Sequence, residues 1–333
     1  MLKYLIVLLD DTSTPYCHYE NPKTEYKLIS LQDLRAAILL AMKENLMVQF
    51  VYPDYKLPQK YEEIIETTEH CKIMPVACCA GADIIIGDYW ENPEGRKMDR
   101  DKIYVLRTKK EDFFSHYEKV GEMLIHVARL NIILTDVDTF TEADFDKYKS
   151  VLAELAFQLK DFCNEETIPQ FNLLTDRMLL DSMNNCNAGW ENITLAPNGK
   201  FYVCPAFYLS SDGYSIGDLE NGLDIRNSQL YRMSHAPLCR HCDAYQCKRC
   251  IWLNRKMTLE VNTPSHEQCV TAHLERNASR DLLQEIRKSG RFLQGREIME
   301  IDYLDPFDVR KVIGRLILAR MRFIWFTKND WFE

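Results

Sequence analysis

The sequence has no excess of positive charge, no long apolar run and no repeated or low-complexity segment. Its net charge of -9 at pH 7 argues against a general nucleic-acid-binding protein, because that role normally needs a basic face. No uninterrupted apolar stretch reaches the roughly 18 residues that are needed to span a bilayer. The apolar run that starts the chain stops at Asp10 and Asp11 without a small-residue cleavage site, so we expect a buried first strand and not a signal peptide.

The composition is that of a globular protein. The 333 residues are 46% apolar and 27% charged, and a chain of this length can bury one large core or two ordinary ones. We expect a cytoplasmic location, where thiols stay reduced. Clustered cysteines in that compartment are more typical of metal ligands than of disulfides.

Cysteine is concentrated in one quarter of the chain. Two Cys-x2-Cys pairs lie between residues 239 and 250. That spacing lets one tight turn present two sulfurs to the same ion or cluster. Seven of the twelve cysteines are therefore candidate metal ligands, namely Cys186, Cys204, Cys239, Cys242, Cys247, Cys250 and Cys269.

The spacing of these cysteines is that of a known domain. The pattern Cys-x12-Gly-x4-Cys from Cys186, a compact four-cysteine block and a last lone cysteine together resemble the SPASM domain of radical S-adenosylmethionine peptide-maturing enzymes. The block has gaps of x2, x4 and x2, whereas the usual gaps there are x2, x5 and x3. Residues 213–228 resemble the connecting segment of that family. More narrowly, the chain resembles the CXXX repeat peptide maturases.

The first 180 residues alternate short apolar runs with longer segments of helical periodicity. This alternation predicts an α/β fold with a mainly parallel sheet under helical cover. Strands are predicted at residues 5–9, 47–52, 72–78, 83–87, 103–106, 131–135 and 171–174, and helices at 31–45, 61–70, 111–128 and 142–162.

The resemblance adds domain assignments to this pattern. It implies a degenerate, partial TIM-barrel-like radical SAM half at residues 1–180, a cysteine-rich SPASM-like domain at 181–275 and a helical C-terminal region at 276–333. Residues 306–326 combine basic and apolar side chains. Docking of this segment on the chain's own core or on a partner is favoured over a membrane surface.

The loop after the first strand departs from the radical SAM pattern. Such enzymes carry Cys-x3-Cys-x2-Cys there, because three thiolates leave one iron open for the cofactor; this loop has Cys17 alone. The second strand is usually followed by a Gly-Gly-Glu-Pro stretch, but residues 51–58 of this chain read Val-Tyr-Pro-Asp-Tyr-Lys-Leu-Pro. We therefore expect reductive cleavage of S-adenosylmethionine to be lost, while binding of this molecule stays open. No catalytic residue is assigned.

Two other readings of this loop are less favoured. Cys17 and His18 suggest a nucleophile and its base, but adjacent residues rarely converge on one centre, so a structural or incidental cysteine is preferred. Asp10 and Asp11 could form an acid/base pair at the carboxyl end of a strand, although a solvated loop is preferred.

Local signals place two of the candidate ligands. Asn198-Gly199 between two short strands at residues 191–196 and 201–204 predicts a hairpin, because both residues tolerate positive φ. Ser265 is a predicted N-cap, which places Cys269 in the first turn of a helix where the dipole favours a thiolate.

The SPASM resemblance implies two 4Fe-4S clusters with interleaved ligands. Cys239, Cys242, Cys247 and Cys269 would hold one, and Cys186, Cys204 and Cys250 the other. The second set lacks a fourth thiolate, for which Cys163 is the nearest upstream candidate. An iron left open in this cluster could bind a cysteine thiolate of a substrate peptide.

Zinc is the alternative. Cys239, Cys242, Cys247 and Cys250 could close one tetrahedral site by themselves. The four residues between the two pairs are few for a zinc ribbon, in which roughly 15 to 20 are usual. Cysteines without any metal would require seven coincidences of spacing.

The resemblance implies maturation of a ribosomally made cysteine-repeat (CXXX) peptide with the help of auxiliary clusters, although the residues themselves do not show a reaction. Two classes remain open: an enzyme that modifies the peptide, and a peptide-presenting subunit that serves a separate modifying enzyme. The alternative is a non-catalytic, zinc-stabilised peptide-binding scaffold. Expected partners are thus a cysteine-rich precursor peptide and a modifying enzyme, with no nucleic acid.

Overall fold

The computed structural model describes residues 2–87, 90, 98–163, 169–210, 214–247, 249–290, 293, 295 and 297–298. Met1–Arg296 forms one compact unit and Glu297–Glu333 a second. The predicted amphipathic segment at residues 306–326 lies outside the described residues. Among the described residues, no helix combines the length and the apolar character that crossing a membrane requires.

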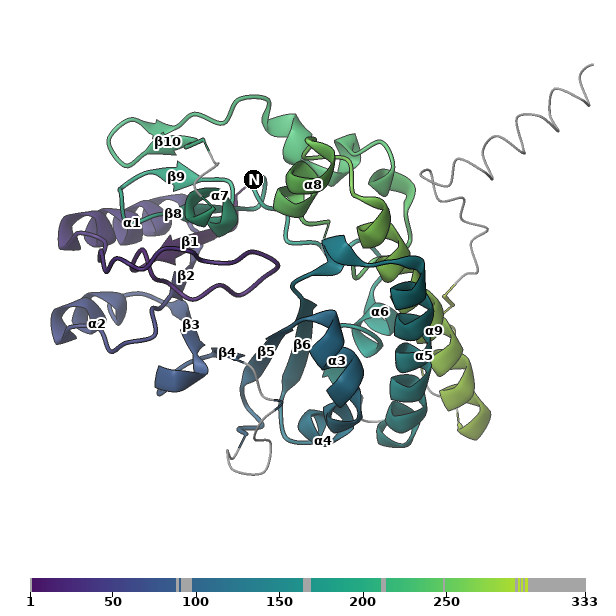
Figure 1. Cartoon of the computed structure of the whole chain (residues 1–333). Coiled ribbons are helices and arrows are strands. Elements are labelled where there is room, and N and C mark those ends of the chain that lie inside the picture. Colours follow the sequence, from purple (N-terminus) through teal and green to yellow (C-terminus); the bar gives the residue numbers. More distant parts are fainter. Residues whose placement is uncertain are drawn as a thin grey trace, which may run out of the picture. The chain divides into compact units, whose positions relative to one another are not determined.

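One nine-stranded sheet organises the first unit (Figure 1). Its order is β7-β6-β5-β4-β3-β2-β1-β8-β9, and every neighbouring pair is parallel except β8 with β9. The strands are β1 Tyr4–Leu8, β2 Met47–Val51, β3 His70–Pro75, β4 Ile84–Gly87, β5 Ile103–Thr108, β6 Arg129–Leu134, β7 Gln170–Phe171, β8 Asn192–Leu195 and β9 Phe201–Tyr202. Within the described residues the sheet stays open, with β7 and β9 at its edges. The predicted α/β class with an incomplete barrel is confirmed.

The helices follow the strands in the alternation that the sequence predicts. In Figure 1, α5 and α9 run side by side, and the two helices are in contact along their length. A separate two-stranded ribbon joins β10 Gly217–Asp218 to β11 Gly222–Leu223. The helices are α1 Leu31–Glu44, α2 Gln59–Ile65, α3 Lys110–His116, α4 Val120–Leu124, α5 Glu142–Leu159, α6 Thr175–Leu179, α7 Pro205–Leu209, α8 Ile251–Thr258 and α9 His266–Ser289.

Caps and apolar patterns explain the elements that were predicted correctly. β1 is apolar on both faces and buried from Leu5 onward, as expected for a strand inside a parallel sheet. The side chain of Ser30 caps α1, which ends at Asn45 in the left-handed conformation. Thr141 begins α5 with a capping box.

Three predicted boundaries were wrong. The helix predicted at 61–70 ends at Ile65, because His70 already pairs with β2 as the first residue of β3. The strand predicted at 72–78 ends at Pro75, which lacks the amide donor for a further ladder bond. The single helix predicted at 111–128 is divided into α3 and α4. Ala128, the last residue of the predicted helix, is not helical, and its amide donates a hydrogen bond to the Lys102 carbonyl just before β5 (3.1 Å).

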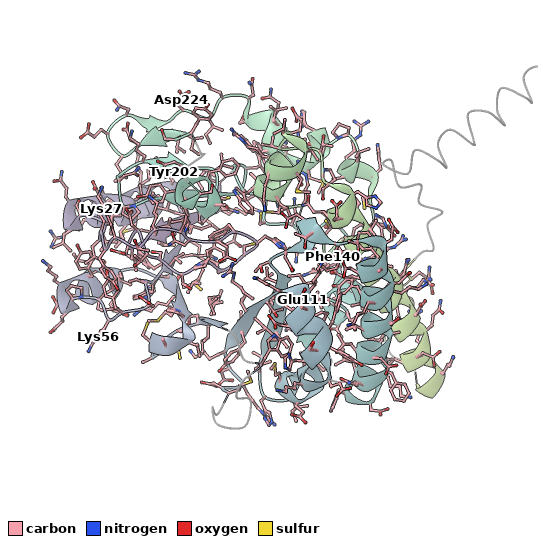
Figure 2. All side chains as sticks on the ribbon, in the orientation of Figure 1. Lys27, Lys56, Glu111, Phe140, Tyr202 and Asp224 are labelled. Carbon is pink, nitrogen blue, oxygen red and sulfur yellow. The ribbon has the colours of Figure 1, made fainter. Side chains whose placement is uncertain are left out.

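Aromatic side chains fill the space between the sheet and its helices. The ring of Phe140, labelled in Figure 2, lies 6.2 Å from that of Phe114 and 5.9 Å from that of Tyr148, centroid to centroid. Tyr202, also labelled there, packs 5.1 Å from Tyr208 on α7. Edge-to-face and tilted contacts of this kind stabilise an apolar core.

Candidate metal centre

The hairpin of β8 and β9 carries Cys204 beside the first strand. Leu195 pairs with Phe201, and Gly199 makes the turn at φ +75°, a conformation in which a Cβ atom is strained. The predicted hairpin is confirmed, although Asn198 does not share the positive φ. Cys204 lies two residues after the end of β9 and precedes Pro205, the first residue of α7.

Cys186 lies just ahead of the same hairpin. The side-chain amide of Asn192, the first residue of β8, donates a hydrogen bond to the carbonyl of Cys186. Asn192 also pairs with Tyr4 of β1, in parallel register. This contact therefore ties the exposed Cys186 to the central sheet.

Successive turns fold the cysteine block at residues 239–250. The amide of Cys242 donates to the carbonyl of Cys239 (3.1 Å), and the amide of Cys247 donates to that of Ala244 (2.8 Å). Cys250 precedes α8, and its carbonyl accepts a hydrogen bond from the Asn254 amide (2.8 Å). The Cys239 and Cys242 pair thus has a turn that can direct two thiols to one place.

Cys269 lies in the first turn of α9, as predicted. Ser265 is the N-cap, and with Gln268 it forms a reciprocal capping box. The Cys269 amide donates to the Ser265 carbonyl (3.2 Å). The positive end of the helix dipole therefore faces this sulfur, which favours the thiolate that a metal binds.

A cavity of about 610 Å³ is lined by four thiols, those of Cys17, Cys186, Cys204 and Cys250. The pKa of Cys250 is raised well above its ordinary value by a hydrogen bond with the Cys17 thiol and by burial. Burial also raises the pKa of Cys204, and the nearby Cys186 sulfur adds to this increase. Three of these cysteines belong to the predicted set; Cys17 was not among the predicted ligands.

The remaining four thiols form a second group. Burial raises the pKa of Cys247, and the sulfurs of Cys239, Cys269 and Cys242 contribute to the increase. The pKa of Cys242 is likewise raised, mainly by burial. A bound metal ion has the opposite effect, because it favours the deprotonated thiolate.

Arg249 lies between the two thiol groups. Its side chain is 1% exposed, and it donates hydrogen bonds to Tyr231 O (3.3 Å) and to the Asn262 side chain. Burial lowers its pKa, while the neighbouring sulfurs of Cys239 and Cys186 oppose that change. A buried cation beside two sets of thiols suits anionic metal-thiolate centres, whose charge it partly balances.

These side chains are not placed so that they could all bind a single metal ion. Within the described residues, no three His, Cys, Asp or Glu side chains converge to hold a metal ion. Zinc would require four donors about 2.0 to 2.3 Å from one point. Cys250 lies with the thiols of the large cavity, whereas the other three cysteines of the zinc hypothesis lie in the second group. Cys163, the upstream candidate, is buried and does not line this cavity.

The two aspartates after β1 have structural roles. Asp10 is fully buried, and its carboxylate accepts hydrogen bonds from the amide (2.8 Å) and hydroxyl (2.6 Å) of Thr12. Asp11 accepts a hydrogen bond from the Tyr208 hydroxyl, and the ammonium of Lys23 is 3.8 Å away. The expectation of a solvated loop was wrong for Asp10, because a tight turn encloses its carboxylate.

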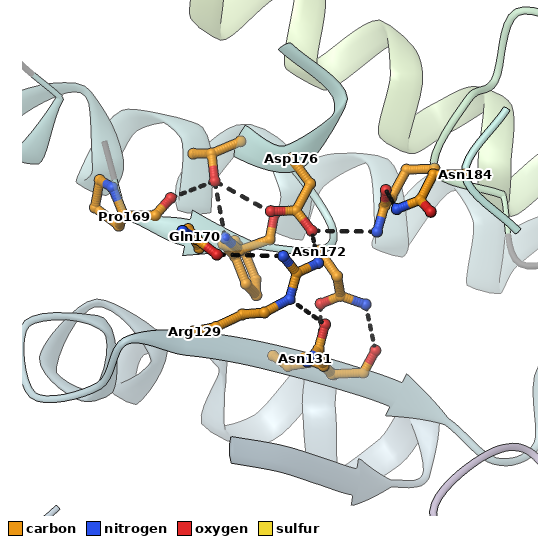
Figure 3. A network of polar contacts seen from close by, with 11 residues as sticks. Arg129, Asn131, Pro169, Gln170, Asn172, Asp176 and Asn184 are labelled. Atoms are coloured by element: carbon orange, nitrogen blue, oxygen red, sulfur yellow. Dashed lines mark hydrogen bonds and ion pairs between the residues drawn. The ribbon is translucent and has the colours of Figure 1, made fainter. Parts of the chain in front are cut away.

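A polar network joins the cysteine block to the far end of the sheet (Figure 3). The carboxylate of Asp176 on α6 pairs with Arg129 of β6 and accepts a hydrogen bond from the side chain of Gln246 (3.2 Å). Asn184 in turn donates its backbone amide to the Tyr245 carbonyl (2.6 Å). Gln246 immediately precedes Cys247, so the network fixes the position of that cysteine relative to the sheet.

Residues 186–251 match the family model described as the SPASM iron-sulfur cluster-binding domain. This cysteine-rich segment is therefore similar to the SPASM domain. The match includes six of the seven predicted ligands, and Cys269 follows it in the sequence. No curated protein sequence matches the chain.

Solved structures show the same fold at low sequence identity. Native anSMEcpe with bound AdoMet and Cp18Cys peptide is 10% identical, with a TM-score of 0.57 over 86% of this chain and 100% of that one. Histidine-tagged anSMEcpe with bound AdoMet gives 10% identity and a TM-score of 0.58, over 86% and 96%. A further anSMEcpe structure, with AdoMet and Kp18Cys peptide, gives 11% and 0.57 over 86% and 99%. These likenesses support the open parallel sheet as a radical SAM-like fold.

Proposed function

We propose that this protein is an iron-sulfur subunit in the maturation of a ribosomally made, cysteine-rich peptide, and that it presents the peptide to a separate modifying enzyme. One observation carries the proposal. The sheet has a radical SAM-like fold, yet the loop after β1 contains a single cysteine, which lines the cavity of the cysteine-rich region. The thiols that could bind clusters thus belong to the auxiliary set, not to a catalytic triad.

The residues fit two clusters better than one zinc ion. Cys239, Cys242, Cys247 and Cys269 would hold one 4Fe-4S cluster. Cys186, Cys204 and Cys250 would contribute to the other, in the cavity of about 610 Å³. Such clusters supply one-electron transfer and rigid cross-links. The grouping of Cys250 away from Cys247 supports this division over a single four-thiolate zinc site.

The residues do not fit a radical SAM cluster. Three thiolates are needed in the loop after β1 to leave one iron open for AdoMet, and Cys17 is the one cysteine there. AdoMet therefore has no assigned role in this chain. A modifying reaction carried out by this chain would have to use another reactant.

The peptide substrate is proposed from two likenesses. The anSMEcpe structures carry bound peptides, and the cysteine spacing of this chain is similar to that of the CXXX repeat peptide maturases. We propose a division of roles at residues 180 and 275: a sheet half without radical chemistry, a cluster-binding segment at 181–275 and a C-terminal region at 276–333. A reducing, cytoplasmic setting suits free thiols.

Metal analysis tests the cluster assignment. Anaerobically purified protein should contain about eight irons with matching sulfide and absorb broadly in the visible range, as two 4Fe-4S clusters do. About one zinc per colourless chain would overturn the assignment and favour the zinc-stabilised scaffold.

Binding measurements test the role. A fluorescent CXXX-repeat peptide should bind the cluster-loaded protein, and AdoMet should show no saturable binding in equilibrium dialysis. The matched control is the same peptide with serine at each cysteine, which should bind more weakly. Saturable AdoMet binding, or conversion of the peptide by this chain alone, would replace the presenting role with an enzymatic one.

A further inference from the structure

The loop that carries Cys17 is fixed to the sheet on two sides. Arg107 of β5 donates its Nε hydrogen to the Cys17 carbonyl (2.9 Å) and an Nη2 hydrogen to the Tyr19 carbonyl (2.7 Å). The ring Nδ1 of His18 lies 2.9 Å from the Leu134 carbonyl at the end of β6. Charge-assisted and ring hydrogen bonds to backbone carbonyls fix the path of a loop as well as its ends. The position of Cys17 is therefore set by the sheet.

Aromatic packing joins this loop to the cysteine-rich region. The ring of Tyr19, 3% exposed, meets that of Trp252 edge-on at 6.5 Å, and Tyr16 packs against Tyr19 at 5.9 Å. Trp252 lies two residues after Cys250 on α8. These three rings line the same cavity as Cys17 and form an apolar wall around it, which limits the access of water.

The cavity brings Cys17 together with the three predicted ligands that lack a fourth partner. Cys186 precedes and Cys204 follows the β8–β9 hairpin, which extends the sheet beside β1. The start of α8 contributes Cys250. Cys17 lies in the loop beyond the carboxyl end of β1, whereas the other three thiols reach the cavity from β8, β9 and α8; Tyr4 and Ile6 of β1 line the same cavity between them.

We propose that Cys17 is the fourth protein ligand of the cluster held by Cys186, Cys204 and Cys250. This inference rests on the proposed iron-sulfur function. Each of the four thiols gives up one proton as its sulfur bonds to one iron, and no electron is transferred. The cluster is then fully bound by the protein, and it cross-links the loop after β1 to the cysteine-rich region. With Cys17 as the fourth ligand, this cluster has no open iron for a peptide thiolate, in contrast to the hypothesis that the sequence allows.

Substitution of Cys17 tests the ligand. Cys17→Ser and Cys17→Ala should lower iron from about eight per chain to between about four and seven, as one 4Fe-4S centre is lost or becomes a three-iron centre. Electron paramagnetic resonance of the oxidised variants should show the three-iron signal where that centre persists. Cys163→Ser is the matched control, because Cys163 is also buried, lies outside the cavity and should retain the wild-type iron content and spectrum.

A measurement on the wild-type chain covers the case in which the variants do not fold. Alkylation with iodoacetamide, followed by peptide mass spectrometry, should find Cys17 protected in the loaded protein and modified after iron is chelated, whereas Cys79 should react alike in both. Equal modification of Cys17 before and after chelation would overturn the ligand assignment. So would Cys17 variants with full iron and unchanged spectra. Wild-type protein without iron would instead overturn the iron-sulfur function itself.

Discussion

The loop after β1 and the segment at residues 239–250 differ in what they can bind. Both lie in a chain whose sheet follows a radical SAM-like fold. The loop has one cysteine, whereas the segment has four. The sheet can persist without a catalytic triad because apolar burial, not metal binding, stabilises it. The comparison shows that the fold alone does not imply radical chemistry in this chain. The thiols are the groups that indicate what chemistry the chain can support.

The largest effect is expected from substitutions in the cysteine block. Cys247→Ser and Cys250→Ser should each remove one cluster, so that iron falls from about eight to about four per chain in either variant. The two variants should lose different centres, because the two thiols have different neighbours. Electron paramagnetic resonance of the reduced proteins should therefore give distinct residual signals.

The double variant supplies the control for this division. Cys247→Ser/Cys250→Ser should lose nearly all iron if the clusters are separate. If one four-thiolate zinc site is present instead, either single substitution removes the whole metal content and the double adds nothing. Identical residual signals in the two single variants would contradict the interleaved ligand sets.

Local signals in the sequence were enough to predict much of this architecture. Ser30 and Thr141 begin helices that the periodicity predicts, and Gly199 folds the hairpin, because each acts on its own neighbours along the chain. Cys269 in the first turn of α9 follows from Ser265 in the same way. The predicted elements were least accurate at their ends, where sheet pairing decides the boundary.

The place of Cys17 could not be predicted by such local reasoning. It depends on β8 pairing with β1 across nearly the whole described unit, and a single sequence contains no direct signal for that parallel contact. The burial of Arg249 depends equally on distant segments, since its partners are Tyr231 and Asn262. Charge alone would predict a solvent-exposed side chain for this arginine.

The polar network of Figure 3 offers an intermediate effect that would sharpen the comparison. Asp176→Ala should lower the free energy of unfolding of the metal-free protein by about 3 kcal/mol, because it leaves Arg129 without its carboxylate partner. It also removes the contact with Gln246, so Cys247 should be alkylated faster in metal-free protein. Urea unfolding and alkylation rates measure the two effects.

An exposed aspartate provides the control for that substitution. Asp101→Ala should change neither the unfolding midpoint nor the alkylation of Cys247, because the Asp101 residue is exposed. If Asp176→Ala lowers stability but leaves the Cys247 rate unchanged, the sheet and the cysteine block unfold independently. The network would then be a property of the sheet alone.

The smallest effect is expected at the N-terminus of α5. Asp144 accepts hydrogen bonds from the Thr141 amide (2.8 Å) and from Lys110 (2.7 Å), and the bond from Lys110 holds its pKa below the ordinary 3.8. A lowered pKa stabilises the fold above about pH 4, and that contribution is lost as pH falls through the folded-state value. Asp144→Asn should therefore lower the free energy of unfolding by about 1 kcal/mol at pH 7 and almost not at all at about pH 2, with iron content unchanged.

Asp146→Asn, on the exposed face of α5, is the control in urea unfolding at both pH values. A loss of iron in Asp144→Asn would show that the sheet half and the cluster-binding half are coupled through α5.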